Sequence, residues 1–406
     1  MINVIGLGYI GLPTALMFAS KGINVVGTDI NEQHVKDLNE GRLYFEEKGL
    51  EELFASAREN GIKFTNEYIK SGVYIVTVPT PYIEETKKVD MKYVVKAVNT
   101  ILDICEKGTI IIIESTISPG SIDEHIRPAI QKRGFIIGED IHLIHAPERI
   151  LPGNMIYELE FNSRTVGADD EEIGYKVIDL YKSFCKAEIV LTDIKSAEMS
   201  KVVENTFRDI NIAFANELAI ICREAGLDVY EIIRIANKHP RVNILQPGPG
   251  VGGHCIPVDP WFLIGDYPNH TKLITSARKV NDRMPNYIYN RILEIMAEHN
   301  IDDFSKVGLY GLSYKQNVDD VRESPTLQLL NVIKENDQKT PHVYDPYIKN
   351  NIVDGQVQNI DKFIKNSEII VIMISHSNLL NDLSNLDNKI VFDTRNSINV
   401  RGAYKL

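Results

Sequence analysis

A glycine-rich turn between a short apolar run and an amphipathic segment near the N-terminus constrains the fold more than any other feature. Residues 2–6 and 24–29 predict two strands, and residues 11–21 predict the helix between them. The turn has the spacing G-x-G-x-x-G, formed by Gly6, Gly8 and Gly11. The first glycine permits a tight turn, the second a close approach of phosphates to the backbone, and the third close packing of helix on strand. This opening predicts a doubly wound α/β sheet that binds a dinucleotide.

An acidic residue follows the second predicted strand at the position expected for ribose recognition. The Asp29 carboxylate can accept hydrogen bonds from both ribose hydroxyls, and Ile30 and Asn31 follow it without an arginine that would receive a 2′-phosphate. The pattern therefore favours NAD over NADP. Residues 77–81 and 114–116 end later strands at the edge of the sheet that a cofactor crosses, although each segment alone is also an ordinary strand exit.

The rest of the chain divides into three parts. Further β-branched runs alternate with helical segments up to Thr192-Asp193, where a helix N-cap starts a long helix that ends near Gly226. Strand and helix alternate again from Lys306, and residues 307–313 weakly repeat the opening glycine pattern. We predict two doubly wound Rossmann-like domains joined by a mainly helical central domain with a long connector helix. The predicted boundaries are 1–192, 193–300 and 301–406.

Composition limits the partners of the chain. Asp and Glu number 56 against 44 Lys and Arg, a net charge of −12, so the overall field repels nucleic-acid backbones and anionic lipid headgroups. No apolar run reaches membrane-spanning length, and no basic leader precedes the first strand. The four cysteines form no Cys-x-x-Cys pair. We expect a cytoplasmic protein without a metal, nucleic-acid partner or membrane partner, and the connector helix suggests a homodimer or a higher homo-oligomer.

A second glycine-rich loop, residues 248–259, carries one cysteine in a distinctive context. Cys255 follows Gly252-Gly253-His254 and precedes Ile256-Pro257, so its backbone is both accessible and fixed. An oxidation that carries an alcohol past the aldehyde to an acid needs a group that holds the aldehyde carbon covalently, and a thiolate is such a group. The other cysteines lie in helical or apolar contexts and are expected to be buried and inert: Cys105, Cys185 and Cys222.

The connector helix carries a polar face and an apolar face. Lys201, Asn205 and Arg208 lie at i, i+4 and i+7, and Glu204 could pair with Lys201 or Arg208. Periodicity alone favours a solvated stripe of ion pairs at these positions. The apolar positions at helical spacing are Val202, Phe207, Ile210, Phe214, Leu218 and Ile221.

Six motifs occur in one order along nearly the whole chain. They are Gly6-x-Gly8-x-x-Gly11, Glu114-Ser115-Thr116, Pro147-Glu148-Arg149, Lys201-x-x-x-Asn205, Gly252-Gly253-His254-Cys255 with Asp259, and Arg322-Glu323-Ser324-Pro325. This set resembles the UDP-glucose/GDP-mannose dehydrogenase family. Within the family, residues 146–153, 239–241 and 248–261 look most like the branch that acts on UDP-N-acetyl-D-mannosamine. UDP-glucose enzymes usually lack this His-Cys loop, and the enzymes for UDP-N-acetylglucosamine and UDP-N-acetylgalactosamine tend to have Tyr in place of Trp261.

The resemblance implies catalytic roles for residues that match the family motifs. Cys255 would be the nucleophile. Lys201 would donate and accept protons and, together with Asn205, would stabilise the negative oxygen of the adducts, the task of an oxyanion site. Asp259 would orient Lys201 or a water molecule. For these residues the resemblance outweighs the solvated stripe that periodicity favours.

The resemblance also implies ligand contacts. Glu148 and Thr116 would position the water that hydrolyses the adduct. The nucleotide sugar would be contacted by Arg149, Ile150, Lys201, Asn205, Arg208, His239, Arg241, Gly252, Tyr314 and Lys315, with Arg241 reaching in from a neighbouring subunit. NAD would be contacted by Gly6, Gly8, Tyr9, Ile10, Gly11, Asp29, Thr80, Thr116 and Arg322.

The implied reaction is a four-electron oxidation of a UDP-N-acetylhexosamine at its primary alcohol to the uronic acid, in polysaccharide biosynthesis. It would pass through a thiohemiacetal and a thioester on Cys255 and use two NAD. UDP-N-acetyl-D-mannosamine is the first expectation, with UDP-N-acetylglucosamine, UDP-N-acetylgalactosamine or UDP-glucose as alternatives. A two-electron hydroxyacid dehydrogenase would leave Cys255 and the third domain unexplained. A non-catalytic nucleotide-sugar sensor would bind both ligands without reducing NAD.

Overall fold

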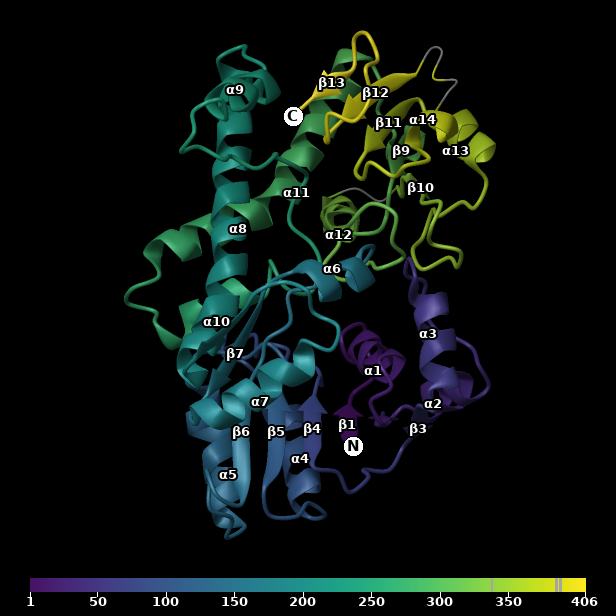
Figure 1. The fold of residues 1–406 in the computed structure, drawn as a ribbon. Helices are drawn as coiled ribbons and strands as arrows, with labels where there is room; N and C mark the ends of the chain where they lie inside the picture. Colours follow the sequence, from purple (N-terminus) through teal and green to yellow (C-terminus); the bar gives the residue numbers. More distant parts are fainter. Residues whose placement is uncertain (337–338, 384–385, 387–388) are drawn as a thin grey trace. The chain divides into compact units, whose positions relative to one another are not determined.

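The computed structural model describes residues 1–336, 339–383, 386 and 389–406, which form two compact units. Unit 1 comprises residues 1–204 and 261–266, and unit 2 comprises residues 205–260 and 267–406. Each unit has its own sheet and its own hydrophobic core (Figure 1). Two helices contain residues of both units: α8 (Ile194–Glu224) and α10 (Asp259–Asp266).

Unit 1 is built on an eight-stranded sheet of order β3-β2-β1-β4-β5-β6-β7-β8. The strand order reverses between β1 and β4, and ligands of such sheets bind beyond the carboxyl ends of the strands at this point. Neighbouring strands are parallel except β7, which is antiparallel to β6. The strands are β1 (Ile2–Ile5), β2 (Val25–Thr28), β3 (Lys63–Thr65), β4 (Val73–Val76), β5 (Thr109–Ile113), β6 (Ile141–His145), β7 (Arg164–Ala168) and β8 (Ile189–Thr192).

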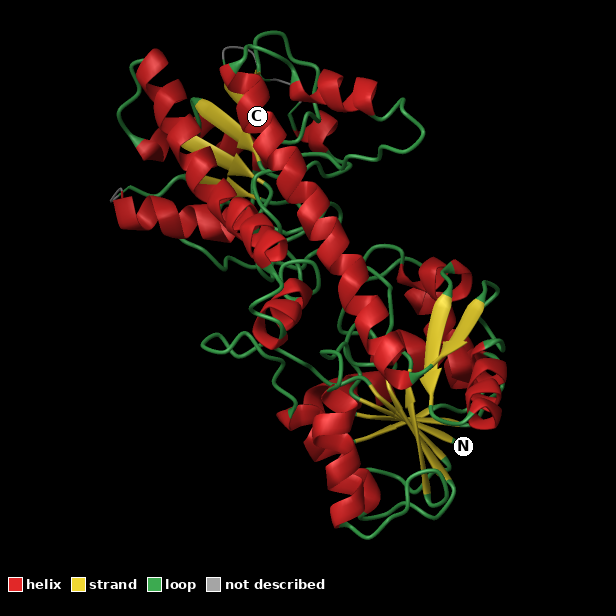
Figure 2. Cartoon of the chain, turned by 90° about the vertical axis from the view of Figure 1, so that its left-hand side faces the viewer, coloured by secondary structure: helices red, strands yellow, loops and turns green. Residues whose placement is uncertain are grey.

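Helices lie on both sides of this sheet (Figure 2). α1 is buried along nearly its whole length because it packs against the first strands and against α3. The side chains of Asn31 and Asp170 cap α2 and α7 by accepting backbone N–H groups of the first turn. The helices are α1 (Gly11–Ser20), α2 (Glu32–Asn39), α3 (Leu50–Glu59), α4 (Lys92–Leu102), α5 (Arg127–Lys132) after a π-helical turn at Ile122–Ile126, α6 (Met155–Phe161) and α7 (Glu171–Tyr181).

Unit 2 contains a smaller sheet of order β10-β9-β11-β12-β13 in which all neighbouring strands are parallel. Its strands are β9 (Val307–Tyr310), β10 (His342–Tyr344), β11 (Ile369–Ile372), β12 (Ile390–Asp393) and β13 (Tyr404–Lys405). α11 packs against α12. The helices that lie wholly within the unit are α9 (Val229–Ala236), α11 (Lys272–Glu298), α12 (Pro325–Asn336), α13 (Ile360–Asn366) and α14 (Leu379–Asp382), and a 3₁₀ turn covers Phe304–Lys306.

The two sheets repeat one local geometry after their first strands. Gly6 has φ +91°, and the next residue, Leu7, donates its N–H to the Asp29 carboxylate at 2.6 Å. In the second sheet Gly311 has φ +97°, and the N–H of Leu312 donates to the Asp345 carboxylate at 2.7 Å. An acidic residue at the end of the second strand thus fixes the glycine turn in both sheets.

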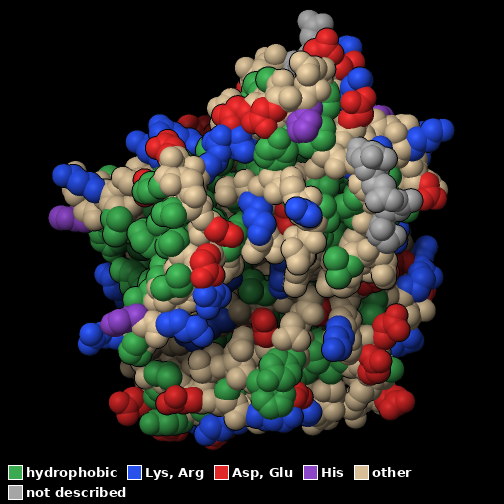
Figure 3. All heavy atoms as spheres, turned by 90° about the horizontal axis from the view of Figure 1, so that it is seen from above, with side chains coloured by type: hydrophobic (Ala, Val, Ile, Leu, Met, Phe, Trp, Pro, Cys, Tyr) green, Lys and Arg blue, Asp and Glu red, His purple; other side chains and the backbone are tan. Residues whose placement is uncertain are grey.

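The predicted fold class is confirmed, with two Rossmann-like parallel sheets and a helical central region. The boundaries at residues 192 and 300 stay a prediction, because the two units group the helical segments with one sheet or the other. Within the described residues, no helix is both long and apolar enough to span a bilayer. On the face drawn in Figure 3, acidic and basic side chains are interspersed.

Candidate active site

The glycine turn of unit 1 has the geometry that a dinucleotide requires. A Cβ atom on Gly11 would lie 1.8 Å from the carbonyl oxygen of Gly6, so close packing of α1 on β1 excludes any side chain at position 11. A Cβ on Gly8 would meet no heavy atom within 4 Å, which leaves the backbone approachable there. α1 starts without a side-chain cap at Ile10. The N–H of Leu12 donates to the carbonyl oxygen of Gly8 at 3.1 Å and Pro13 has no N–H, so the N–H of Gly11 is the group of the first turn that can bind a phosphate oxygen.

The acidic residue beside this turn is fixed by the backbone and still accessible. The Asp29 carboxylate accepts the N–H of Leu7 at 2.6 Å and the N–H of Asn31 at 2.8 Å, and the residue is half-buried. At the ends of β4 and β5, Thr80 donates its hydroxyl to the carbonyl oxygen of Thr116 at 2.6 Å. The approachable glycine, the N–H of Gly11 at the start of α1 and the fixed carboxylate therefore fit NAD.

The segment after β6 holds two residues expected to act in the site. Glu148 is buried, and its carboxylate accepts the N–H of Arg149 at 2.7 Å. The guanidinium of Arg149 pairs with Glu204 of α8 at 3.0 Å. The expected pairing of Glu204 with Lys201 or Arg208 was therefore wrong, because Glu204 faces a residue 55 positions earlier in the chain.

Two residues on the polar face of α8 are buried, so this face is not the solvated stripe that periodicity favours. Lys201 and Asn205 are one helical turn apart and only 6% and 5% exposed, while Arg208 is half-buried. The amide of Asn205 donates to the buried Asp259 carboxylate at 2.6 Å. The structure thus brings two residues of the predicted catalytic set together, although they are 54 positions apart in sequence.

Cys255 lies in the turn that leads into α10. Its carbonyl oxygen accepts the N–H groups of Val258 and Asp259 at 3.1 and 2.8 Å, which fixes the backbone at the cysteine, and the residue is partly exposed. Asp259, the first residue of α10, therefore contacts Asn205 through its side chain and Cys255 through its backbone. The predicted nucleophile therefore lies in a hydrogen-bonded turn.

The two glycines before the cysteine allow its loop to pack closely on the second sheet's loops. A Cβ on Gly252 would lie 2.6 Å from the carbonyl oxygen of Glu323, and a Cβ on Gly253 would lie 2.7 Å from the ring of Tyr314. Gly253 also has φ +92° and donates its N–H to the carbonyl oxygen of Arg322 at 3.0 Å. The structure therefore places the predicted contacts Gly252, Tyr314 and Arg322 beside the cysteine loop.

The other three cysteines differ from Cys255. Cys185 and Cys222 are buried, as expected. Cys105 is only half-buried and lies in the loop between α4 and β5, so the expectation of full burial was wrong for this residue. Partial burial raises the pKa of the Cys105 thiol, which lowers its thiolate fraction and its reactivity.

The remaining predicted residues are distributed over both units. Ile150 is buried, and the ring centroid of Tyr9 lies 4.6 Å from that of Phe45. His239 and Arg241 are exposed in the turn after α9, where the N–H of Arg241 donates to Nδ1 of His239 at 3.3 Å. Lys315 is half-buried in the loop after β9.

Sequence reasoning missed a buried glutamate at the start of α8. Glu198 accepts the backbone N–H groups of Gly120 and Ile122 at 2.5 and 3.0 Å, and so holds the segment that follows Thr116. Burial raises the pKa of Glu198 to about 7, although both N–H groups favour its ionised form. An acidic residue among Ala197 and Met199 was the available signal, but its partners are more than 70 positions away.

Sequence reasoning also missed Arg164. This buried arginine forms ion pairs with Glu148 and with Glu114, and the hydroxyl of Tyr181 donates to Glu114. The E-S-T motif includes Glu114, but its buried partners come from β7 and α7 and leave no local trace in the sequence.

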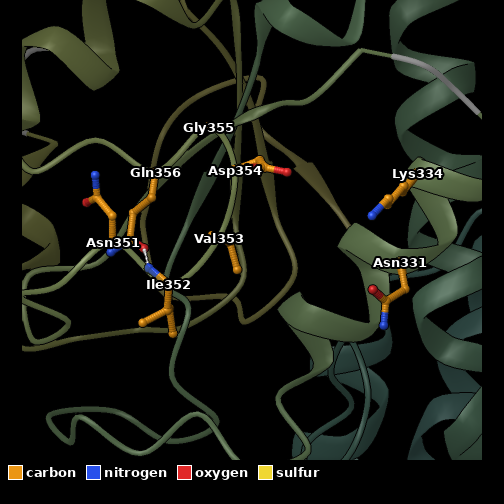
Figure 4. A pocket seen from close by; sticks show the side chains of 8 residues that line it. All are labelled: Asn331, Lys334, Asn351, Ile352, Val353, Asp354, Gly355 and Gln356. Carbon is orange, nitrogen blue, oxygen red and sulfur yellow. Dashed lines mark hydrogen bonds between the residues drawn. The ribbon is translucent and has the colours of Figure 1, made fainter.

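A cavity of about 640 Å³ in unit 2 lies apart from these residues. Asn331 and Lys334 of α12 line one side and residues 351–356 the other, with the N–H of Ile352 donating to Gln356 at 2.8 Å (Figure 4). None of the residues predicted for catalysis or ligand binding lines it. In the described part of the chain, no group of three or more His, Cys, Asp or Glu side chains is placed to hold a metal ion.

The sheet of unit 1 and its glycine turn define a dinucleotide-binding α/β protein. Three models of one family match the chain in order: the NAD-binding domain of the UDP-glucose/GDP-mannose dehydrogenase family over residues 1–185, its central domain over 195–283 and its UDP-binding domain over 308–400. The chain belongs to this family, whose members are NAD-dependent nucleotide-sugar dehydrogenases, and the resemblance drawn from the motifs is confirmed.

Individual relatives match over nearly their full length. The UDP-N-acetyl-D-mannosamine dehydrogenase of Methanococcus vannielii is 42% identical over 98% of this chain and 93% of its own. The NDP-N-acetyl-D-galactosaminuronic acid dehydrogenase of Ralstonia solanacearum is 37% identical, with 97% and 95% covered. The solved structure of the UDP-D-ManNAc dehydrogenase of Pyrococcus horikoshii has a TM-score of 0.91 at 37% identity and covers 100% of this chain and 98% of that one.

Proposed function

We propose that this protein oxidises UDP-N-acetyl-D-mannosamine at the primary alcohol of the sugar to the uronic acid. The observation that carries the proposal is the loop of Cys255, which is fixed, partly exposed and packed against Tyr314 in a chain of this family. Relatives 42% identical over 98% of the chain act, by name, on this sugar. The name of the 37% identical relative makes UDP-N-acetylgalactosamine the leading alternative, ahead of UDP-N-acetylglucosamine and UDP-glucose.

In the proposed reaction, different residues of the chain act at different steps. NAD, when bound, supplies the hydride acceptor, so that one alcohol, two NAD and one water give one carboxylate, two NADH and three protons. The Cys255 thiolate adds to the aldehyde carbon formed in the first oxidation and gives a thiohemiacetal, whose oxidation leaves a thioester. Lys201 accepts the proton of the alcohol and of the thiohemiacetal. Because one N–H of the Asn205 amide is held by Asp259, the other is oriented to donate to the oxygen of the adducts.

The decisive experiment counts NADH for each UDP-sugar consumed. The purified protein is incubated with NAD and a panel of UDP-sugars, and the acid is identified by mass spectrometry. We expect two NADH per UDP-N-acetyl-D-mannosamine. One NADH would point to a two-electron dehydrogenase, and binding of both ligands without NADH formation would identify a non-catalytic sensor. The same panel with NADP should give little turnover, because Asp29 would repel a 2′-phosphate.

Replacement of Lys201 by alanine should lower kcat by about 10²-fold or more, the scale of losing an oxyanion partner. The same helix offers a matched control in Lys195, which lies six residues earlier and is exposed, and its replacement by alanine should leave kcat unchanged. Steady-state NADH formation measures both variants. Wild-type turnover in the Lys201 variant would remove this lysine from the mechanism.

We further propose that the protein is a homodimer, or a higher homo-oligomer, held together through α8. Phe207, Phe214 and Ile221 recur every seven residues, so they share one stripe of the helix, and they are 63%, 52% and 60% exposed. Exposed apolar stripes of this kind mark protein–protein contacts. A second copy would bring its own equivalent stripe, as a two-fold interface requires.

A single charge in this stripe should dissociate the oligomer. Phe214→Glu is expected to sediment at the 45.9 kDa mass of one chain, whereas the unmodified protein sediments at a multiple of it. Ile136→Glu changes a comparably exposed apolar residue of unit 1 and should leave the oligomer intact. An unmodified protein at the mass of one chain would refute the proposed interface.

A further inference from the structure

Four buried side chains of unit 1 form a cluster, and of these four only Glu148 has an expected role, the positioning of the hydrolytic water that the family resemblance implies. Glu114 follows β5, Glu148 follows β6, Arg164 begins β7 and Tyr181 ends α7. Each is 6% exposed or less, so bulk solvent screens their charges little. We call these four residues the Arg164 cluster.

Arg164 is the only cation among the four, and it contacts both carboxylates. Its guanidinium pairs closely with Glu148, and its Nη1 lies 3.5 Å from Oε1 of Glu114. The guanidinium carbon lies 4.5 Å from the ring centroid of Tyr181 and 5.4 Å from that of Phe184. An arginine keeps its charge even when it is buried, so Arg164 presents a permanent positive charge to both glutamates.

The cluster holds one guanidinium against two buried carboxylates, so one positive charge faces two acidic groups. Burial raises the pKa of Glu114, Arg164 offsets this in part, and the negative charge of Glu148 raises it further. Glu148 has the closer ion pair and also accepts the N–H of Arg149, whereas Glu114 accepts the hydroxyl of Tyr181. The pKa of Glu114 is therefore raised, whereas the Glu148 carboxylate is the one held by the closer ion pair with Arg164.

We propose that Arg164 is a positioning residue for hydrolysis of the Cys255 thioester, because its guanidinium pairs with the Glu148 carboxylate and holds it in place. The inference rests on the proposed function, since it requires that thioester. In the step concerned, water adds to the thioester carbonyl carbon and the carbon–sulfur bond breaks. The sulfur leaves as the Cys255 thiol with one proton of the water, and the acid releases the other proton as it ionises. A carboxylate held by Arg164 orients the water for this attack.

The test is to replace Arg164 by methionine and follow the covalent adduct. Both oxidations precede hydrolysis, so the variant should form two NADH per active site rapidly and then turn over about 10- to 100-fold more slowly. The mass of the intact protein should show the acyl group on Cys255 during turnover, whereas the unmodified protein should not accumulate it. Arg164→Lys retains the charge and should restore part of the steady-state rate and shorten the life of the adduct.

The chain provides a matched control at the surface of the same unit. Arg127 also pairs with two carboxylates, those of Asp123 and Asp169, but its partners are largely exposed. Arg127→Met should neither lower the steady-state rate nor accumulate the adduct. A change of the same size in both arginine variants would indicate general damage to unit 1 and would overturn the inference.

Other outcomes separate this inference from the proposed function. One NADH per sugar from the unmodified protein would refute the proposed function. Two NADH from the unmodified protein, together with a folded Arg164→Met variant that never accumulates the adduct, would refute only the role of Arg164. Should Arg164→Met fail to fold, Arg164→Lys decides, because a rate below that of the unmodified protein without any adduct contradicts the inference.

Discussion

Replacement of Cys255 by serine is expected to abolish formation of the acid while NAD still binds. A serine hydroxyl is not ionised near neutral pH, so it cannot capture the aldehyde as a thiolate does. The loss should be at least about 10³-fold in acid production, because no other nucleophile of the proposed mechanism can replace the thiol. NAD binding should persist because the glycine turn and Asp29 belong to unit 1, whereas Cys255 lies in unit 2.

Cys105→Ser is the matched control for this experiment. Cys105 is the other partly exposed cysteine, so the control tests whether any accessible thiol suffices. We expect full acid production from this variant, measured by mass spectrometry of the product and by the ratio of NADH to sugar. Calorimetric titration with NAD checks that the Cys255 variant is intact. Full acid production by Cys255→Ser would remove the thiol from the mechanism.

Elements defined by their own local sequence could be predicted closely. β5 is a run of four isoleucines after Thr109, and α9 starts at the side-chain cap provided by Asp228, so composition and capping alone locate both. β3, with only Lys63–Thr65, was not predicted, because it is a three-residue edge strand with a single buried side chain. The antiparallel pairing of β7 with β6 is likewise a property of the whole sheet.

In the candidate site too, features defined by local sequence could be predicted, whereas contacts between distant segments could not. The turn at Gly6 and the loop at Cys255 are local backbone geometries, and the glycine spacing of each could be interpreted directly. The partner of Glu204 could not, because helical spacing offered Lys201 and Arg208 while the fold supplies Arg149 from the segment after β6. Which buried charges meet depends on strand order, and that order could not be inferred from the local patterns of this sequence.

On α8, helical periodicity identified the apolar positions but did not show which of them are buried. Val202 is fully buried, whereas Phe207 and Phe214 are more than half exposed, although all three belonged to the predicted apolar set. The predicted apolar set therefore combines residues that pack within the chain with residues that lie exposed on α8. The structure was therefore needed to distinguish the exposed apolar residues of α8 from the buried ones.

Removal of Asp209 is expected to lower the free energy of unfolding by about 3–5 kcal/mol, the usual result of leaving a buried charge unpaired. Asp209 of α8 is fully buried and accepts Nη1 of Arg278 at 2.5 Å and the amide of Asn281 at 2.8 Å, both from α11. Asp209→Ala would leave the buried guanidinium with Asp282 as its remaining partner among the pairs formed in the described residues. Urea unfolding followed by circular dichroism measures the change.

Asp282 supplies the matched control, because it pairs with the same arginine but its side chain is 48% exposed. Asp282→Ala should cost less than about 1 kcal/mol, as surface ion pairs do. Replacing both buried partners, as in Asp209→Leu with Arg278→Met, should recover most of the loss, because no unpaired charge then stays buried. Equal effects of the two aspartate variants would contradict this account.

The network of Asp209 also reaches the cysteine loop. The side-chain oxygen of Asn281 accepts the amide of Asn216, and the side-chain oxygen of Asn216 accepts the N–H of Gly248, so the same network anchors the start of the cysteine loop. Asp209→Ala should therefore also increase hydrogen exchange at residues 248–255, whereas Asp282→Ala should not.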